Sequence, residues 1–311
     1  MTPLAAVLLG CMAGATAVAL PAVSSPRILQ RTTETVRIEQ LDESLLPTGD
    51  RRLIFIGDIH GCKDKLLELL DDAEYNQETD HIVAVGDIVN KGPDTLGVID
   101  YLMSQNASSV RGNHEERIVP LAEAANITEA YDNPNSSPEA IAQALSPAQL
   151  SYLQSFPHIL RIGTNLPTFR GETIVAHAGL VPGLALEAQV PDSVMNMRAL
   201  DTQTLEVSNA RAEAGSLENH WFVVWDEHQF WYSLTSWVRK LLGKDKAAPR
   251  ATVIYGHDSR LGLQLGSYHR GLDTRCSAGG YLTALVVSDG GAKEAIVTVD
   301  CPNYEEQVAE S

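Results

Sequence analysis

Five short segments of the chain combine glycine with aspartate, asparagine or histidine, which are residue types that bind metal ions. The segments are Gly57-Asp58-Ile59-His60-Gly61, Gly86-Asp87, Gly112-Asn113-His114-Glu115, His177-Ala178-Gly179-Leu180 and Gly256-His257. Oxygen ligands mixed with imidazole nitrogens suit a divalent cation such as Mn, Fe or Zn. Two such ions held close together can clamp a phosphoryl group and activate water for in-line attack. The five segments therefore predict a two-metal phosphohydrolase.

Four of these segments follow short apolar runs, each of which predicts a buried strand. The runs cover residues 52–56, 81–85, 173–176 and 251–255. In open α/β sheets, ligands bind in the crevice at the carboxyl ends of the strands. Glycine at such a strand end lets the backbone turn tightly and approach the ligand closely. We therefore expect an α/β fold in which the polar side chains meet at one edge.

The motifs resemble those of the calcineurin-like metallophosphoesterases of the phosphoprotein phosphatase superfamily, over about residues 51–300. The resemblance implies a metallophosphatase fold, with a central two-sheet β-sandwich flanked by helices and a dinuclear metal site at the strand ends. It implies two divalent ions, which could be Mn, Zn, Fe or Co. Asp87 would bridge the ions, and His114 would be the general acid, a role that suits a side chain titrating near neutral pH. The implied metal ligands are Asp58, His60, Asp87, Asn113, His177 and His257.

The second motif departs from that of the serine/threonine protein phosphatases, which have Gly-Asp-x-Val-Asp-Arg-Gly. Here Asn90 replaces the aspartate that orients the catalytic histidine, and Lys91 replaces an arginine that grips phosphate. Asparagine can hydrogen-bond His114 but cannot stabilise an imidazolium by charge, and lysine lacks the planar fork of arginine. The Asn-Lys-Gly-Pro version resembles a subfamily that includes bacterial diadenosine tetraphosphatases and a yeast vacuolar endopolyphosphatase.

The same subfamily resemblance extends to residues 177–183, 195–198, 255–258 and 271–276. It implies further residues around the metal ligands, with roles in holding phosphate or in orienting a ligand. The implied phosphate-binding cations are Lys91, Arg198 and Arg111. The implied outer hydrogen-bonding partners of the site are Asn90 and Asp258.

Three functions from different classes fit this pattern. The first is cleavage of phosphoanhydrides, with inorganic polyphosphate as the expected substrate and an endopolyphosphatase as the expected enzyme. The second is hydrolysis of dinucleoside polyphosphates or capped nucleotides, or protein phosphatase activity. The third is a non-catalytic scaffold. The formal net charge of −17 argues against sequence-specific nucleic-acid binding, which needs a basic surface.

The chain divides into three parts by composition. Residues 1–25 are almost uncharged and predict a signal peptide or a single membrane anchor, and residues 26–50 predict a linker or an arm packed on the core. Residues 51–311 would form the metallophosphatase domain, with a helical insertion at about 126–157. The first part favours the endomembrane lumen, most of all the vacuole, or secretion; the alternative is a cytoplasmic protein.

Smaller features give further expectations. Ser137 and Ser146, each followed by proline, predict two helix starts, for either a lid or a structural helical pair. Residues 230–242 predict a helix packed on the core, residues 201–215 a loop, and the last ten residues a frayed end. Of the three glycosylation sequons, those at Asn126 and Asn135 should be exposed. Cys62 and Cys276 are interpreted as small core residues, with an oxidation-sensitive site as the alternative.

Overall fold

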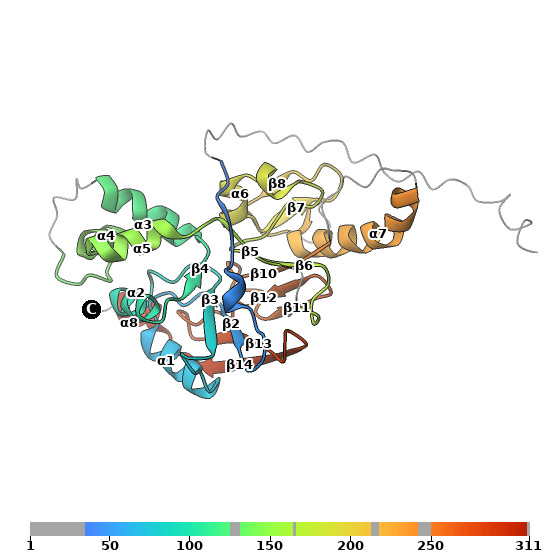
Figure 1. The fold of residues 1–311 in the computed structure, drawn as a ribbon. Coiled ribbons are helices and arrows are strands. Elements are labelled where there is room, and N and C mark those ends of the chain that lie inside the picture. The colour runs from blue at the N-terminus through green and yellow to red at the C-terminus, as the bar shows by residue number, and fades with distance from the viewer. Residues whose placement is uncertain (1–34, 125–130, 164–165, 213–217, 242–249, 310–311) are drawn as a thin grey trace, which may run out of the picture.

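The computed structural model describes residues 35–124, 131–163, 166–212, 218–241 and 250–309 (Figure 1). The predicted signal or anchor at 1–25 and the sequon at Asn126 lie outside the described residues. Within them, no helix is both long enough and apolar enough to cross a membrane.

Strands and helices alternate along most of the chain, as the apolar runs predicted. The strands are β1 (Ile38–Gln40), β2 (Arg52–Ile56), β3 (Asp80–Ala84), β4 (Ser108–Ser109), β5 (Ile159–Gly163), β6 (Glu172–Ala176), β7 (Ala199–Asp201), β8 (Val207–Ser208), β9 (Glu218–His220), β10 (Ala251–Tyr255), β11 (Gln264–Leu265), β12 (His269–Gly271), β13 (Tyr281–Ser288) and β14 (Lys293–Asp300). The helices are α1 (Lys63–Asp72), α2 (Thr95–Ser104), α3 (Asn113–Ala124), α4 (Pro138–Ala144), α5 (Pro147–Ser155), α6 (Pro191–Asn196), α7 (Trp221–Leu241) and α8 (Tyr304–Ala309), with 3-10 turns η2 (Glu43–Leu45) and η3 (Leu186–Ala188).

Two large sheets pack face to face to form the predicted sandwich. The first sheet has the order β14-β13-β2-β3-β4, and the second has the order β1-β5-β6-β10-β12-β11. The described part of the N-terminal arm belongs to the second sheet, because β1 pairs in parallel with β5. Figure 1 shows α1 and α7 at opposite sides of the paired sheets. The fold class is therefore the metallophosphatase α/β fold that the motifs predicted.

Alternation along β2 shows why the sandwich forms. Leu53 and Phe55 point into the apolar layer between the two sheets, whereas Ile54 and Ile56 point to the helices on the outer face. All four side chains are completely buried, which a strand of period two achieves only when both of its faces are covered. Burial of each such side chain contributes about 1.5–3 kcal/mol to folding.

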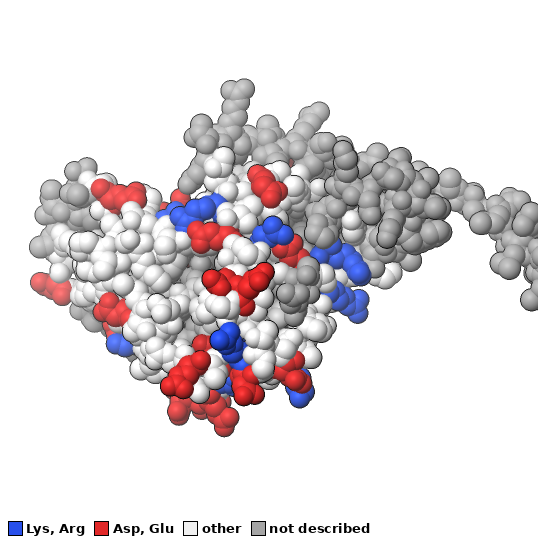
Figure 2. Space-filling model, in the orientation of Figure 1, with Lys and Arg blue, Asp and Glu red and all other residues white. Residues whose placement is uncertain are grey.

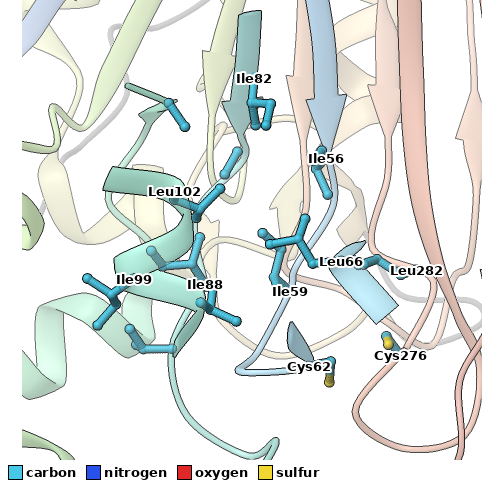
Figure 3. Packing of buried hydrophobic residues seen from close by; sticks show 14 of the residues in the cluster. Ile56, Ile59, Cys62, Leu66, Ile82, Ile88, Ile99, Leu102, Cys276 and Leu282 are labelled. Atoms are coloured by element: carbon cyan, nitrogen blue, oxygen red, sulfur yellow. The ribbon is translucent and has the colours of Figure 1, made fainter. Parts of the chain in front are cut away.

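The outer face of the first sheet is sealed by helices. Figure 3 shows Ile56 of β2 and Ile82 of β3 facing Leu66 of α1 and Leu102 of α2. The strand-to-helix loops also contribute apolar side chains to this layer, among them Ile59 between the metal-motif residues Asp58 and His60. Ile59 therefore anchors the first metal motif between its two polar residues.

Both predicted helix starts after residue 136 are confirmed. Ser137 and Ser146 cap α4 and α5, and Ser146 forms the reciprocal capping box with Gln149. The pair buries Ile141 and Leu153 in the same apolar layer as α2, so it packs as part of the body. Within this region, Asn135 differs from the expected exposed sequon, because its side-chain amide donates to Pro93 O at 2.7 Å and accepts from the Thr95 amide at 2.9 Å.

The expected loop at 201–215 is partly wrong, because β7 and β8 pair with each other and β7 also pairs with β9. The helix predicted at 230–242 is confirmed as the end of α7. Its expected packing on the core is wrong for Trp231, which is 48% exposed, and the side chains of residues 233–241 lie outside the described residues. The described core side chains of α7 are near its start, where Trp225 belongs to the core as predicted.

The predictions for the C-terminus and for the cysteines also differ from the structure. Residues 304–309 form α8 instead of a frayed end, because Cys301 and Cys276 form a disulfide just before it and the buried Tyr304 donates to Asp64. Cys276 is a buried core residue as predicted, but its disulfide with Cys301 was not predicted. Cys62 is a buried free thiol, and burial raises its pKa to about 12, which makes it unreactive toward oxidants.

Candidate metal centre

The sheet topology brings the motif residues together. β2 pairs in parallel with β3, and β6 pairs in parallel with β10, so the carboxyl ends of these strands lie side by side within each sheet. Backbone bonds then join the loops beyond the strands: the His60 amide donates to Asp87 O at 2.9 Å, and the Gly256 amide donates to His177 O at 2.9 Å. Four segments far apart in the sequence thus meet at one edge of the sandwich.

Two groups of side chains at this edge could each hold a metal ion. One group is His60, Asp87 and His114, and the other is Asp87, His177 and His257, with all ligand atoms in a group within 4.8 Å of one another. Asp87 belongs to both groups. Its Oδ2 lies 3.8 Å from His60 Nε2 and 3.3 Å from His177 Nε2. This shared position is the one that the family resemblance implied for a bridging carboxylate.

The remaining predicted ligands lie beside the two groups. Asn113 Oδ1 lies 3.1 Å from His177 Nε2 and 3.0 Å from His257 Nδ1, so its oxygen faces the second group. Asp58 Oδ2 lies 4.0 Å from His60 Nε2, and the Asp58 carboxylate accepts from the His257 amide. The structure therefore brings all six predicted ligands to one place.

The charges at this edge fit divalent cations. Asp58, Asp87 and Asp273 are all at least 95% buried, and an uncompensated buried carboxylate is costly. Burial, together with the charge of Asp273, raises the pKa of Asp58 well above its ordinary value. His177 is fully buried, which disfavours its charged form, yet contact with Asp87 raises its pKa to about 10. Asp58 and His177 thus hold a proton more tightly than exposed groups would. The cluster therefore has the negative charge and the ligand atoms that a divalent ion needs.

Backbone carbonyl groups orient the histidines. Nδ1 of His60 lies 3.1 Å from Val89 O, Nδ1 of His177 lies 2.9 Å from Val85 O, and Nε2 of His257 lies 3.1 Å from Asn196 O. Each bond leaves the opposite ring nitrogen facing the cluster, as metal-binding histidines require. Asp258, predicted as an outer partner of a ligand histidine, instead accepts from Arg211, because the backbone carbonyls already take the second nitrogens.

Glu115 holds two of the loops together, a role that the sequence did not reveal. The side chain is fully buried on α3, and its oxygens accept from the amides of Asp87, Ile88 and Gly112 at 2.8–2.9 Å, and from Val89 at 3.3 Å. Burial and the neighbouring charge of Asp87 raise the pKa of Glu115 to about 7. The motif Gly-Asn-His-Glu contained this residue, but only the folded chain shows that it fixes the loop carrying Asp87.

Backbone strain is concentrated in the same loops. Of the ten non-glycine residues with left-handed φ in the described chain, five are the site residues His60, Asp87, Asn90, Lys91 and His257. Such conformations cost free energy and persist at functional sites where the surroundings enforce them. Glycine is required beside them, since a Cβ at Gly112 would come within 2.2 Å of Asp87 Oδ1.

The predicted acid and its partner are in contact. Asn90 Nδ2 lies 2.9 Å from His114 Nδ1, and His114 Nε2 faces Asp87 Oδ2 at 3.9 Å. The side-chain oxygen of Asn90 accepts from the Lys91 amide at 2.8 Å, which fixes the orientation of the amide group. Burial lowers the pKa of His114.

The predicted phosphate-binding cations have different positions. Lys91 Nζ lies 2.9 Å from His60 Nε2, beside the first group of ligands. Arg198 lies 4.0 Å from Asp258, next to His257 of the second group. Arg111 pairs with Glu116 on α3 at 3.3 Å, and its role in binding phosphate stays a prediction. Arg211, which has no motif around it, was not predicted and lies beside Arg198.

Comparisons with known proteins agree with this geometry. A model of the calcineurin-like phosphoesterase family matches residues 51–260. The chain is 26% identical to the zinc-dependent endopolyphosphatase of Saccharomyces cerevisiae, over 86% of this chain and 84% of that protein. It is also 26% identical to a symmetrical bis(5'-nucleosyl)-tetraphosphatase of Nitrosospira multiformis, over 75% of this chain and 92% of the relative.

A crystal structure assigned provisionally as a diadenosine tetraphosphatase superposes with a TM-score of 0.65 and 31% identity, covering 86% of this chain and 99% of that one. The family uses two divalent metals, which suits the two groups of ligands that share Asp87. The chain belongs to the calcineurin-like phosphoesterase family and is a metal-dependent phosphatase.

Proposed function

We propose that the protein hydrolyses phosphoanhydride bonds and that its substrate is inorganic polyphosphate, which it cleaves within the chain. The observation that carries this proposal is the placement of cations on both sides of the metal-binding cluster, with Lys91 beside His60 and Arg198 beside Asp258. A polyanion with phosphates on both sides of the cleaved bond needs positive charge on both sides. Figure 2 shows acidic and basic side chains interspersed on the visible face, and the formal net charge of the whole chain is −17, so these local cations oppose the charge of the whole molecule.

The chain divides the work between holding ions and holding phosphate. His60, Asp87, His177 and His257 would hold two divalent ions, which when bound supply positive charge to the phosphoryl oxygens and lower the pKa of water. Lys91 and Arg198 would bind phosphoryl oxygens and stabilise the charge that develops on them.

Asn90 determines which ring nitrogen of His114 carries the proton. Because the Asn90 oxygen is taken by the Lys91 amide, the amide nitrogen donates to His114 Nδ1. A neutral His114 then carries its proton on Nε2, the atom that faces Asp87. This arrangement lets His114 donate a hydrogen bond from Nε2 to a departing oxygen, because loss of that proton from a neutral ring would leave an imidazolate, and Asn90 gives an imidazolium no counter-charge. It suits a phosphate leaving group, which needs less protonation than an alkoxide.

A second candidate substrate is a dinucleoside polyphosphate. Two relatives support it by name, one at 26% identity and one solved structure at 31% identity. Polyphosphate and dinucleoside polyphosphates share the bond to be cleaved and differ in the need for a base-stacking surface. Two aromatic side chains beside the second group of ligands, Trp221 against Gly179 and Tyr255 two residues before His257, are 2% and 3% exposed. Among the described residues they offer no open platform for a base, which favours polyphosphate.

The test compares the candidate substrates directly. The full chain is stripped of metal, reloaded with Mn, Zn, Co or Mg, and given long-chain polyphosphate, diadenosine tetraphosphate or a phosphopeptide. We expect products of intermediate length from polyphosphate, resolved by gel electrophoresis. Preference for the dinucleotide or the phosphopeptide would overturn the substrate, and hydrolysis of none with any metal would support the scaffold alternative.

We also propose that the protein works in an oxidising compartment, as expected for the endomembrane lumen or outside the cell. The Cys276–Cys301 disulfide supports this, since such bonds are rare in the cytosol. Mass spectrometry of the protein from its native source, alkylated before reduction, should find these two cysteines joined. Two alkylated thiols, with the protein in the cytosolic fraction, would contradict the proposal.

A further inference from the structure

Arg211 is joined to the metal centre through one carboxylate. It follows β8 in the chain, and its Nε donates to Asp258 Oδ1 at 2.8 Å, while Nη2 contacts the same oxygen. Asp258 directly follows His257 of the second group of ligands. The side chain of Arg211 stays 34% exposed although this ion pair holds its inner edge. A guanidinium is therefore fixed in position beside the site with part of its surface open.

Two arginines share that single carboxylate. Arg198 Nε lies 4.0 Å from Asp258 Oδ2, which is too long for a hydrogen bond, and both of these buried atoms lack a hydrogen-bond partner. Burial lowers the pKa of Arg198, and the nearby charge of Arg211 lowers it further. The group thus carries two positive charges and one negative charge. An additional anion would relieve the repulsion between the two arginines and would accept a hydrogen bond from the unpaired Arg198 Nε.

We propose that Arg211 binds the phosphate next to the one that is cleaved, while Arg198 binds the reacting phosphate. This inference rests on the proposed action on phosphoanhydrides. Guanidinium groups match phosphate oxygens in geometry and charge. A phosphomonoester has a single phosphate and so cannot occupy both positions. Arg211 is then a specificity-determining residue that selects substrates with consecutive phosphates.

Binding of a pair of phosphates, measured without turnover, tests the role of Arg211. The probes are imidodiphosphate, whose nitrogen bridge resists hydrolysis, and orthophosphate, each titrated calorimetrically into the Mn-loaded full chain. For Arg211→Gln we expect imidodiphosphate to bind about tenfold more weakly, as for loss of one charged hydrogen-bond pair, while the orthophosphate affinity stays unchanged. Lys293→Gln removes an equal charge from a side chain that is 73% exposed, and should change neither affinity.

The outcomes separate this inference from the proposed function. Equal weakening of both probes, or no change with imidodiphosphate, would overturn the role of Arg211. If Arg211 only held Asp258 in place, Arg211→Gln would also lose bound metal, which elemental analysis of the same samples would detect. Arg211→Lys, which restores charge without the fork, should recover part of the imidodiphosphate affinity. Failure of the wild type to cleave long-chain polyphosphate would overturn the proposed function alone, because the binding comparison requires no catalysis.

Discussion

The two sheets contribute differently to the metal centre. The first-sheet half, made of residues 58–60, 87–91 and 112–115, is bound together by backbone bonds and by the Glu115 carboxylate, which accepts from four amides. The second-sheet half, made of His177, Arg198, Arg211 and residues 257–258, retains buried polar atoms without partners, on Arg198 and Asp258. One half is satisfied internally, whereas the other still has hydrogen bonds to make.

This contrast teaches how a site can be rigid toward metal and open toward substrate. Metal ligands must keep fixed distances, so the loop of Asp87 is held by amide donors on a buried carboxylate. A substrate must gain interactions on binding, so Arg198 keeps an unpaired Nε donor and Arg211 keeps partial exposure. We therefore expect substitution of Asp87 or Glu115 to weaken metal binding and activity together, and substitution of Arg198 or Arg211 to change substrate affinity.

Of these substitutions, Asp87→Asn should lower the enzyme activity most. The bridging position lies within 4 Å of three histidines, and loss of its charge removes the group common to both metal sites. We expect a loss of activity of about 1,000-fold or more, equal to roughly 4 kcal/mol of transition-state stabilisation. Steady-state kinetics and elemental analysis would measure it, with the exposed Asp289→Asn as control. An Asp87→Asn variant that kept both ions and full activity would contradict the assignment of metal binding to Asp87 of the first-sheet half.

The next largest effect should be that of His114→Ala, and it should depend on the substrate. A general acid contributes about 100- to 10,000-fold where the leaving group needs a proton. We expect hydrolysis of an alkyl phosphoester to fall by this amount and cleavage of polyphosphate to fall much less. Rates with both substrates at one pH would decide it. Equal losses would show that the acid serves both reactions alike.

Glu115→Gln should have a smaller effect, confined to the first-sheet half. The amide group would turn one acceptor into a donor facing backbone amides, so at least one of the loop bonds to Asp87 and Gly112 is lost. We expect metal to bind about 10- to 100-fold more weakly, while the orthophosphate affinity of the reloaded enzyme is unchanged. Glu123→Gln on the exposed side of the same helix is the matched control. Unchanged metal affinity would contradict the role of Glu115.

The sequence predicted the local features of both halves better than the contacts between residues far apart in the chain, for a physical reason. Strands 52–56 and 251–255 were predicted residue for residue, because buried runs that end in glycine leave a local signal. The ligands follow those strands directly, so they were found with them. Arg211 meets Asp258 across 47 residues and Cys276 meets Cys301 across 25, and neither contact leaves a pattern near either partner. The contact of Arg111 with Glu116 was likewise not predicted, although the two residues are only five positions apart.

The smallest expected effect is a loss of folding stability in acid, caused by a buried histidine of the first sheet. His81 lies on β3, the strand that leads to Asp87, and its Nε2 contacts the Ser108 hydroxyl at 2.9 Å. Burial lowers the pKa of His81 to about 4, whereas the unfolded chain titrates near 6.5. Below pH 6.5 the unfolded state therefore takes up the proton first. The stability of the fold is complete above that pH and declines as the pH falls toward 4, by about 2–3 kcal/mol.

Replacing His81 by glutamine keeps a polar group opposite Ser108 and removes the titration. We expect His81→Gln to be less stable than the wild type at pH 7, because the cavity is no longer filled as well, and to lose less stability between pH 6.5 and 4.5. Urea unfolding of the metal-free protein at several pH values measures both, and metal-free samples avoid the separate effect of ion release. Ser108→Ala, which retains the imidazole, should keep the steep pH dependence. If the free energy of unfolding fell equally with pH in the wild type and in His81→Gln, the acid lability would arise from other groups. The strand that leads to Asp87 would then not contribute to it.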